Sequence, residues 1–167
     1  PWLYEAMKLK ADVLYERWLT QYRKGEGVPA ETDLREALNL YDQAAALGRS
    51  DVTVYEARAD AWYFFLLQRY DRGLPLAEHL PAALSACSDT IAAAPRRSAG
   101  YQLGTSIHLL VAQQQLDTGG DPRPQIQKLR TLAEAAIKQN AANEFLYNAL
   151  GSGLVLVLFH EEANRLP

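Results

Sequence analysis

The chain has 167 residues, with 17 Lys and Arg against 20 Asp and Glu, and 49% of its residues are hydrophobic. These values are typical of one soluble domain, and the 26 Ala and 26 Leu against only 11 Val and Ile disfavour an all-β or doubly wound fold. The net charge of −3 is spread evenly along the chain, so we expect no binding to nucleic acid. No stretch predicts a transmembrane helix or a signal peptide, and we expect no membrane insertion.

The single cysteine and the first residues bear on the setting of the chain. Cys87 cannot form an intramolecular disulfide, which suits a reducing compartment, so we expect a cytoplasmic protein. An amphipathic helical pattern is already present at Leu3, with no initiator Met before it. We therefore expect this chain to be a piece of a longer polypeptide.

A repeat with a period of 46 residues runs through the chain. Three sets of residues recur at this spacing: Tyr55, Tyr101 and Tyr147; Leu34, Leu80 and Ile126; and Gly73 and Gly119. An earlier copy is present as well, because Lys10–Gly25 matches Arg58–Gly73 at a shift of 48 residues. Such self-similarity is the signature of a repeat architecture, in which each repeat is one supersecondary unit.

Each period predicts a longer helix followed by a shorter one. In chain order, the predicted helices span 3–24, 33–47, 51–72, 80–94, 97–118, 124–139 and 143–162. They form hairpins over 3–47, 51–94 and 97–139, followed by a last helix, and together they make one domain over 1–167. The segment Leu154–Phe159 alternates like a strand in isolation, but its position in the repeat predicts helix.

Turn residues mark the ends of the predicted helices. The first three longer helices each end near a Gly, which suits a left-handed C-terminal cap. We expect Asp33 to cap the second helix by accepting a hydrogen bond from its first-turn amides. Pro81 and Pro124 fit the first turn of their helices, where a missing N–H costs nothing.

The hairpins resemble the tetratricopeptide repeat. Tyr147, Leu150 and Gly151 match the aromatic, Leu and small positions of the first helix of that family. The other matching residues are Tyr55, Arg58, Ala59, Tyr101, Thr105, Ala37, Tyr41, Ala44, Ala83, Pro95, Ala133 and Ala136. The family has a period of about 34 residues, so a period of 46 requires longer helices and loops and leaves HEAT-like and Sel1-like repeats open. The resemblance implies an all-α, right-handed superhelix of antiparallel helix hairpins with a concave surface that binds a protein or peptide.

A narrower resemblance lies at Gly119–Ala141. Its Gly-Asp-Pro-Arg-Pro run is similar to the junction between helical hairpins in tetratricopeptide-like regions that follow the catalytic domain of some bacterial serine/threonine protein kinases. The segment Arg72–Pro95 is a degraded copy of it. The chain itself has no Gly-rich phosphate loop, no His-Arg-Asp motif and no Asp-Phe-Gly motif. The resemblance therefore implies that any catalysis lies upstream, outside this chain.

No set of residues predicts a catalytic or metal site, and we expect no cofactor. His79, His108 and His160 are too far apart in sequence for the three- or four-residue spacing of metal ligands on a helix. We interpret His108 as a core or groove residue at the position that Trp62 occupies one repeat earlier. Cys87 falls on a core-facing stripe, which predicts a buried, unreactive thiol.

The aromatic run from Trp62 to Phe65 presents rings around a whole helix, so it must be buried or meet a partner. We expect Trp62 and Phe65 to pack between hairpins. Tyr63 and Phe64 are then partly exposed on the inner surface, where they can anchor a bound segment.

The tetratricopeptide resemblance also implies which residues line the concave groove. These are Lys8, Asp12, Glu56, Asp60, Gln102, Ser106, Asn148 and Ser152, with Tyr63 one turn further on. Members of the family that bind chaperones clamp a carboxylate terminus with Lys, Asn and Arg at such positions. Because three of the residues here are carboxylates, we expect a basic or mixed-charge segment instead.

The leading interpretation is a protein-interaction module, such as the regulatory or substrate-recruiting region of a bacterial signalling serine/threonine kinase. A structural or dimerising extension without a peptide ligand is the second interpretation, and an enzyme of unknown class is the third. The apolar segment Leu154–Phe159 on the last helix has no second helix after it, so we expect part of it to pair with another chain and form a homodimer.

Overall fold

The computed structural model describes residues 2–25, 29 and 31–165, and these residues form seven α-helices and no β-strand. The helices are α1 (Trp2–Lys24), α2 (Glu31–Leu47), α3 (Val52–Asp71), α4 (Leu80–Ala93), α5 (Ala99–Asp117), α6 (Arg123–Lys138) and α7 (Glu144–Ala163). The prediction of an all-α fold is confirmed. Each predicted helix end lies within two residues of the observed end, and Leu154–Phe159 is helical.

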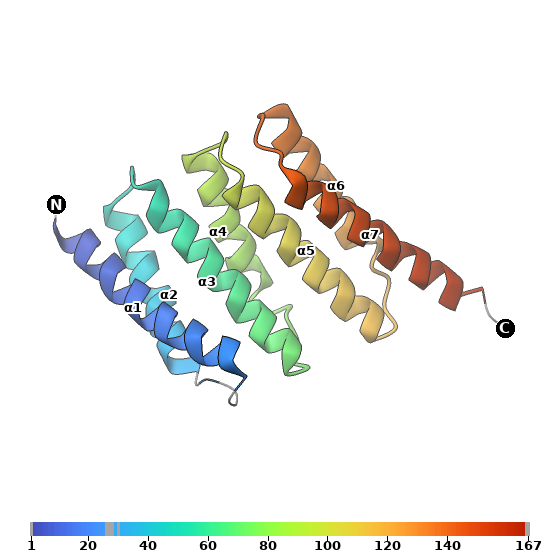
Figure 1. Cartoon of the computed structure of the whole chain (residues 1–167), viewed down its shortest axis with the longest axis horizontal. Helices are drawn as coiled ribbons and strands as arrows, with labels where there is room; N and C mark the ends of the chain where they lie inside the picture. Colours follow the sequence, from blue (N-terminus) through green and yellow to red (C-terminus); the bar gives the residue numbers. More distant parts are fainter. Residues whose placement is uncertain (1, 26–28, 30, 166–167) are drawn as a thin grey trace.

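The helices form two layers (Figure 1). Helices α1, α3, α5 and α7 lie side by side in the front layer, with α2, α4 and α6 behind them, and the two ends of the chain lie at opposite ends of the stack. Among the described residues, each helix contacts only helices at most two positions away along the chain. Such nearest-neighbour packing is characteristic of repeat proteins. The right-handed superhelical twist stays a prediction.

Glycines end the first three long helices as expected. Gly25, Gly73 and Gly119 have φ angles of 65°, 65° and 78°, in the left-handed region that side chains rarely adopt. At the other helix ends, the Asp51 carboxylate accepts a hydrogen bond from the Thr53 amide at 3.0 Å. Pro81 and Pro124 lie in the first turns of α4 and α6, as predicted.

The predicted capping role of Asp33 is wrong. Helix α2 begins at Glu31, so Asp33 already lies inside its first turn. Its carboxylate accepts a hydrogen bond from Nε of Arg17 at 2.7 Å and so ties α2 to α1. A negative charge in the first turn still favours the helix through its dipole, which explains why the residue type resembles a cap.

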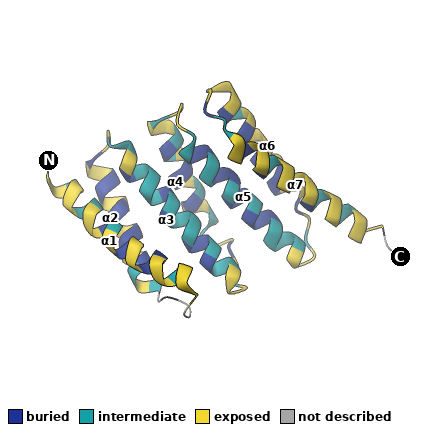
Figure 2. Cartoon of the chain, viewed as in Figure 1, coloured by how far each residue is buried: buried dark blue, intermediate teal, exposed yellow. Residues whose placement is uncertain are grey.

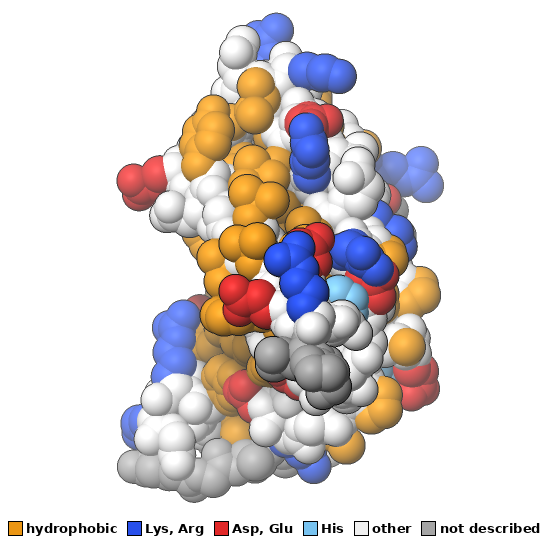
Figure 3. All heavy atoms as spheres, turned by 90° about the vertical axis from the view of Figure 1, so that its right-hand side faces the viewer, with side chains coloured by type: hydrophobic (Ala, Val, Ile, Leu, Met, Phe, Trp, Pro, Cys, Tyr) orange, Lys and Arg blue, Asp and Glu red, His pale blue; other side chains and the backbone are white. Residues whose placement is uncertain are grey.

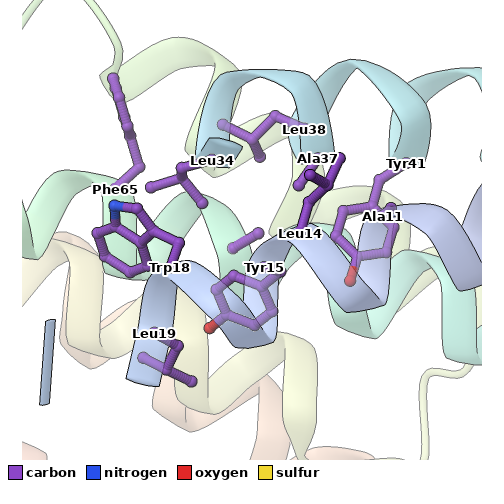
Figure 4. Close-up of a cluster of buried hydrophobic side chains, with 11 residues drawn as sticks. Ala11, Leu14, Tyr15, Trp18, Leu19, Leu34, Ala37, Leu38, Tyr41 and Phe65 are labelled. Atoms are coloured by element: carbon purple, nitrogen blue, oxygen red, sulfur yellow. The ribbon is translucent and has the colours of Figure 1, made fainter. Parts of the chain in front are cut away.

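The core lies where each long helix meets the short helix of its own hairpin and the next long helix. Ala11, Ala59 and Thr105 occupy equivalent positions on α1, α3 and α5, and all three are fully buried. Figure 4 shows the first of these clusters, in which Trp18 of α1 lies beside Leu34 of α2 and Phe65 of α3. Burying one such large side chain contributes about 1.5–3 kcal/mol to folding.

The repeated tyrosines have equivalent environments only in the complete hairpins. The Tyr55 and Tyr101 hydroxyls donate to the carbonyl oxygens of Arg49 and Pro95, six residues earlier in both cases, at 3.4 and 3.2 Å. Tyr147 on α7 is exposed instead. The 46-residue spacing therefore does not give Tyr147 the environment of the other two tyrosines, because no second helix of that repeat is present among the described residues to cover α7.

Candidate binding groove

A groove of about 540 Å³ lies between α3, α5 and the beginning of α7. Its lining residues are Glu56, Ala57, Asp60, Tyr63 and Phe64 from α3, Ala99, Gln102, Leu103 and Ser106 from α5, and Phe145 from α7. The α3 and α5 residues recur at intervals of three and four, so each helix contributes one continuous stripe. Figure 2 shows these two central helices as largely buried or half-buried, whereas much of α7 is exposed.

Two carboxylates lie one turn apart in the groove. The side chain of Glu56 is only 19% exposed, and its Oε1 atom lies 2.9 Å from Nε of Arg97. That oxygen is buried and accepts no hydrogen bond from the part of the chain that the structure describes. Arg97 neutralises this oxygen without a well-aligned hydrogen bond, so a ligand guanidinium that displaces Arg97 can pair with Glu56.

Asp60 is held in place from the neighbouring hairpin. The Tyr15 hydroxyl donates a hydrogen bond to Oδ2 of Asp60 at 2.6 Å. Burial raises the pKa of the Asp60 carboxyl above its ordinary value, although this hydrogen bond and the charge of Arg23 oppose the rise. Burial and the adjacent Asp60 raise the pKa of Tyr15 as well, so its hydroxyl keeps its proton and remains a donor.

Aromatic rings form the apolar part of the groove. The Tyr63 and Phe64 rings meet edge to face, with centroids 5.2 Å apart. Both are half-buried, and Trp62 and Phe65 pack edge to face at 5.6 Å. Phe65 is buried as predicted, but Trp62 is half-buried like Tyr63 and Phe64, so the predicted division of this aromatic run holds only in part. Phe145 adds a third ring to the groove from α7. A groove with carboxylates and aromatic rings can bind a cation through both charge and ring faces.

The structure brings together five of the nine predicted groove residues, Glu56, Asp60, Tyr63, Gln102 and Ser106. Lys8 and Asp12 are not among the residues that line this groove: Lys8 Nζ lies 2.8 Å from Oδ2 of Asp12, and the Asp12 Oδ1 atom accepts a hydrogen bond from Tyr41 at 2.7 Å. Asn148 and Ser152 are exposed on α7 and also do not line it. The row of residues predicted to cross four helices is thus concentrated on α3 and α5.

Sequence reasoning missed Ala57, Ala99, Leu103 and Phe145 as groove residues, and it gave Phe64 only as an inner-surface ring that can anchor a bound segment. Phe145 falls 46 residues after Ala99, so the repeat register already related it to another lining residue. The repeat register therefore contained a signal for Phe145. Only the spacing between α5 and α7 decides that its ring, in the first turn of α7, reaches the groove.

The other candidate residues are parts of the core. Burial raises the pKa of the Cys87 thiol to about 12, which makes it unreactive, as expected. Nδ1 of His108 lies 3.0 Å from Oε1 of Gln125, and burial lowers the pKa of this histidine. The residues that the structure describes contain no group of three or more His, Cys, Asp or Glu that could hold a metal ion.

Comparisons of the chain with protein-family models, with curated proteins and with solved structures find no match. A search of the described helices for one long and apolar enough to cross a membrane also finds none. The geometry of the groove and the sequence pattern therefore carry the functional interpretation.

Proposed function

We propose that this chain is a protein-interaction module of tetratricopeptide-like design that binds a basic segment of a partner protein in the groove between α3 and α5. The observation that carries the proposal is the pairing of Glu56 and Asp60, both withdrawn from solvent, beside the rings of Tyr63, Phe64 and Phe145. A guanidinium group suits such a groove, because it donates several hydrogen bonds in one plane and also packs against aromatic faces.

The charges in the groove favour a basic ligand over an acidic one. Glu56 and Asp60 would repel a carboxylate terminus, and a ligand arginine that displaces Arg97 can make a better-aligned hydrogen bond to Glu56 Oε1. The aliphatic stem of that arginine can pack on the rings while its head reaches the carboxylates. The chain's own cation at this position, Arg97, has a side chain that is 57% exposed, so its displacement costs little.

The Gly119–Ala141 motif supports a more specific setting for this module. Its similarity to regions that follow bacterial serine/threonine kinase domains suggests that the groove recruits substrates or regulators of such a kinase in the cytoplasm. A structural or dimerising role is the second candidate, and the exposed apolar face of α7 favours it.

Fluorescence anisotropy with a labelled peptide, GSGRLRGS, tests the proposed ligand chemistry. We expect this peptide to bind at least tenfold more tightly than its acidic counterpart GSGELEGS. The double variant Glu56→Gln with Asp60→Asn keeps the shape of both side chains and removes their charges. It should weaken binding of the arginine peptide at least tenfold, equivalent to about 1.4 kcal/mol.

A matched control is the double variant Glu78→Gln with Glu134→Gln, which removes two charges from exposed positions outside the groove. It should leave the affinity unchanged within about twofold, because surface charges at a distance are screened by salt. Equal loss of binding in both double variants would reduce the effect to net charge and contradict a specific site.

A further inference from the structure

Two of the chain's own arginines lie at opposite ends of the row of groove residues on α3, which runs from Glu56 to Phe64. Nε of Arg97 lies 2.9 Å from Oε1 of Glu56 at one end, and the guanidinium carbon of Arg23 lies 5.9 Å from the centre of the Phe64 ring at the other. Both arginines are exposed, and neither lines the groove itself. They therefore show how a guanidinium group is held at each end, by a carboxylate at Glu56 and by an aromatic face at Phe64.

The Phe64 end of the groove has a carboxylate as well. Asp60 lies one turn before Phe64, and the charge of Arg23 opposes the rise that burial causes in the pKa of its carboxyl, so Arg23 acts on both the ring and the carboxylate. The Tyr15 hydroxyl donates to Oδ2 of Asp60, whereas Oδ1 accepts no hydrogen bond from the part of the chain that the structure describes. A ligand guanidinium over the Phe64 ring can donate to this second oxygen.

The opposite wall of the groove, on α5, favours an extended ligand over a helical one. Gln102 is half-buried there, and its main-chain oxygen accepts a hydrogen bond from the Ser106 hydroxyl at 2.9 Å. The side-chain amide of Gln102 makes no hydrogen bond to another described residue, so it can both donate to and accept from a ligand. An extended segment leaves its main-chain N–H and C=O groups open to such an amide, whereas a helix pairs most of them internally.

The length of the row on α3 sets the spacing of the ligand arginines. Glu56 and Phe64 are eight residues apart on one helix, which corresponds to about 12 Å along its axis. An extended chain advances about 3.3 Å per residue, and every second side chain faces the same side. Arginines two residues apart are therefore separated by about 7 Å, and arginines four residues apart by about 13 Å. The second spacing matches the distance between the two ends of the groove.

We propose that the groove selects an extended segment with two arginines four residues apart, in which one guanidinium replaces Arg97 at Glu56 and the other replaces Arg23 at Phe64. This inference rests on the proposed binding of a basic segment and specifies which basic segments bind. Both displaced side chains return to water and lose only exposed contacts. Because one ligand carries both arginines, the second contact forms within the complex, and the pair binds more tightly than either arginine alone.

Fluorescence anisotropy with three labelled peptides of identical composition tests the spacing. The peptides GSGSRGRSGSG, GSGRSGSRGSG and GSRGSGSGRSG separate their arginines by two, four and six residues. Figure 3 shows a band of hydrophobic side chains on the side of the molecule where α7 lies, and peptides of only Arg, Gly and Ser have no apolar side chain to place on that band. The peptide with the four-residue spacing should bind at least threefold more tightly than either of the other two.

Two single variants at exposed positions separate the ends of the groove. Arg97→Ala removes the cation at Glu56, so it should tighten the binding of all three peptides by a similar factor. Arg23→Ala removes the cation at Phe64, which only the four-residue spacing reaches together with Glu56, so it should tighten that peptide at least twofold more than the other two. Lys24→Ala is the matched control, because Lys24 is the exposed neighbour of Arg23 and has the same charge; it should affect the three peptides equally.

Equal affinities for the three spacings, with the preference for arginine over the acidic GSGELEGS peptide retained, would overturn this inference and leave the proposed function standing. An Arg23→Ala variant that treats the three peptides as Lys24→Ala does would also overturn it, because the Phe64 end would then hold no ligand arginine. If no arginine peptide binds the wild-type chain, the proposed function and this inference are both wrong.

Discussion

Replacement of Arg97 by Ala tests whether the groove already contains a cation that a ligand must displace. Arg97 Nε lies 2.9 Å from Oε1 of Glu56, and the arginine side chain is 57% exposed. Exposed pairs of this kind contribute about 0.2–1 kcal/mol. A ligand guanidinium loses that amount when it replaces Arg97 at Glu56. Arg97→Ala should therefore tighten binding of the GSGRLRGS peptide by up to about fivefold.

The measurement is the anisotropy of the labelled peptide at low and at physiological salt. Arg96→Ala is the control. Arg96 is an exposed neighbour that does not pair with Glu56, so this variant removes the same charge and leaves the contact at Glu56 in place. The difference between the two variants isolates direct competition from the general effect of a more negative protein. That difference should shrink as salt rises. Binding by Arg97→Ala that is no tighter than binding by Arg96→Ala would refute competition at Glu56.

Three further predictions concern the fold and the groove. Trp18→Ala should lower the free energy of unfolding by about 3–5 kcal/mol in urea denaturation, whereas Trp2→Ala should change it little, because Trp18 is fully buried and Trp2 is 81% exposed. Gly73→Ala should lower the free energy of unfolding by about 1–2 kcal/mol because its φ is 65°, while Gly151→Ala on the open helical surface should raise it by up to about 1 kcal/mol; thermal unfolding compares the two variants. Burial raises the pKa of Asp60, so its carboxylate is protonated as pH falls through a midpoint above 3.8, and the arginine peptide should dissociate there. The same pH titration of peptide binding to Asp60→Asn should not show this transition.

The helices, the buried cysteine and the glycines at the helix ends could be predicted from the sequence by itself. The 46-residue period relates side chains that face the same neighbour in successive repeats, so it predicted the helices, the buried thiol of Cys87 and the helical state of Leu154–Phe159. The left-handed glycines were equally predictable, because only glycine adopts that conformation at no steric cost. Both signals depend on a few neighbouring residues, which is why one sequence suffices for them.

The groove and the exposed end depend on distances that the chain order does not contain. The sequence suggested a row of binding residues across four helices, whereas the spacing between α3, α5 and α7 concentrates the groove on Glu56 and Asp60 and adds Phe145 to it. The period likewise aligns Tyr147 with Tyr55 and Tyr101, but Tyr147 is exposed because no described helix covers it. Periodicity assigns residues to a face, but the packing of helices far apart in sequence decides which of those faces are hollow, filled or uncovered.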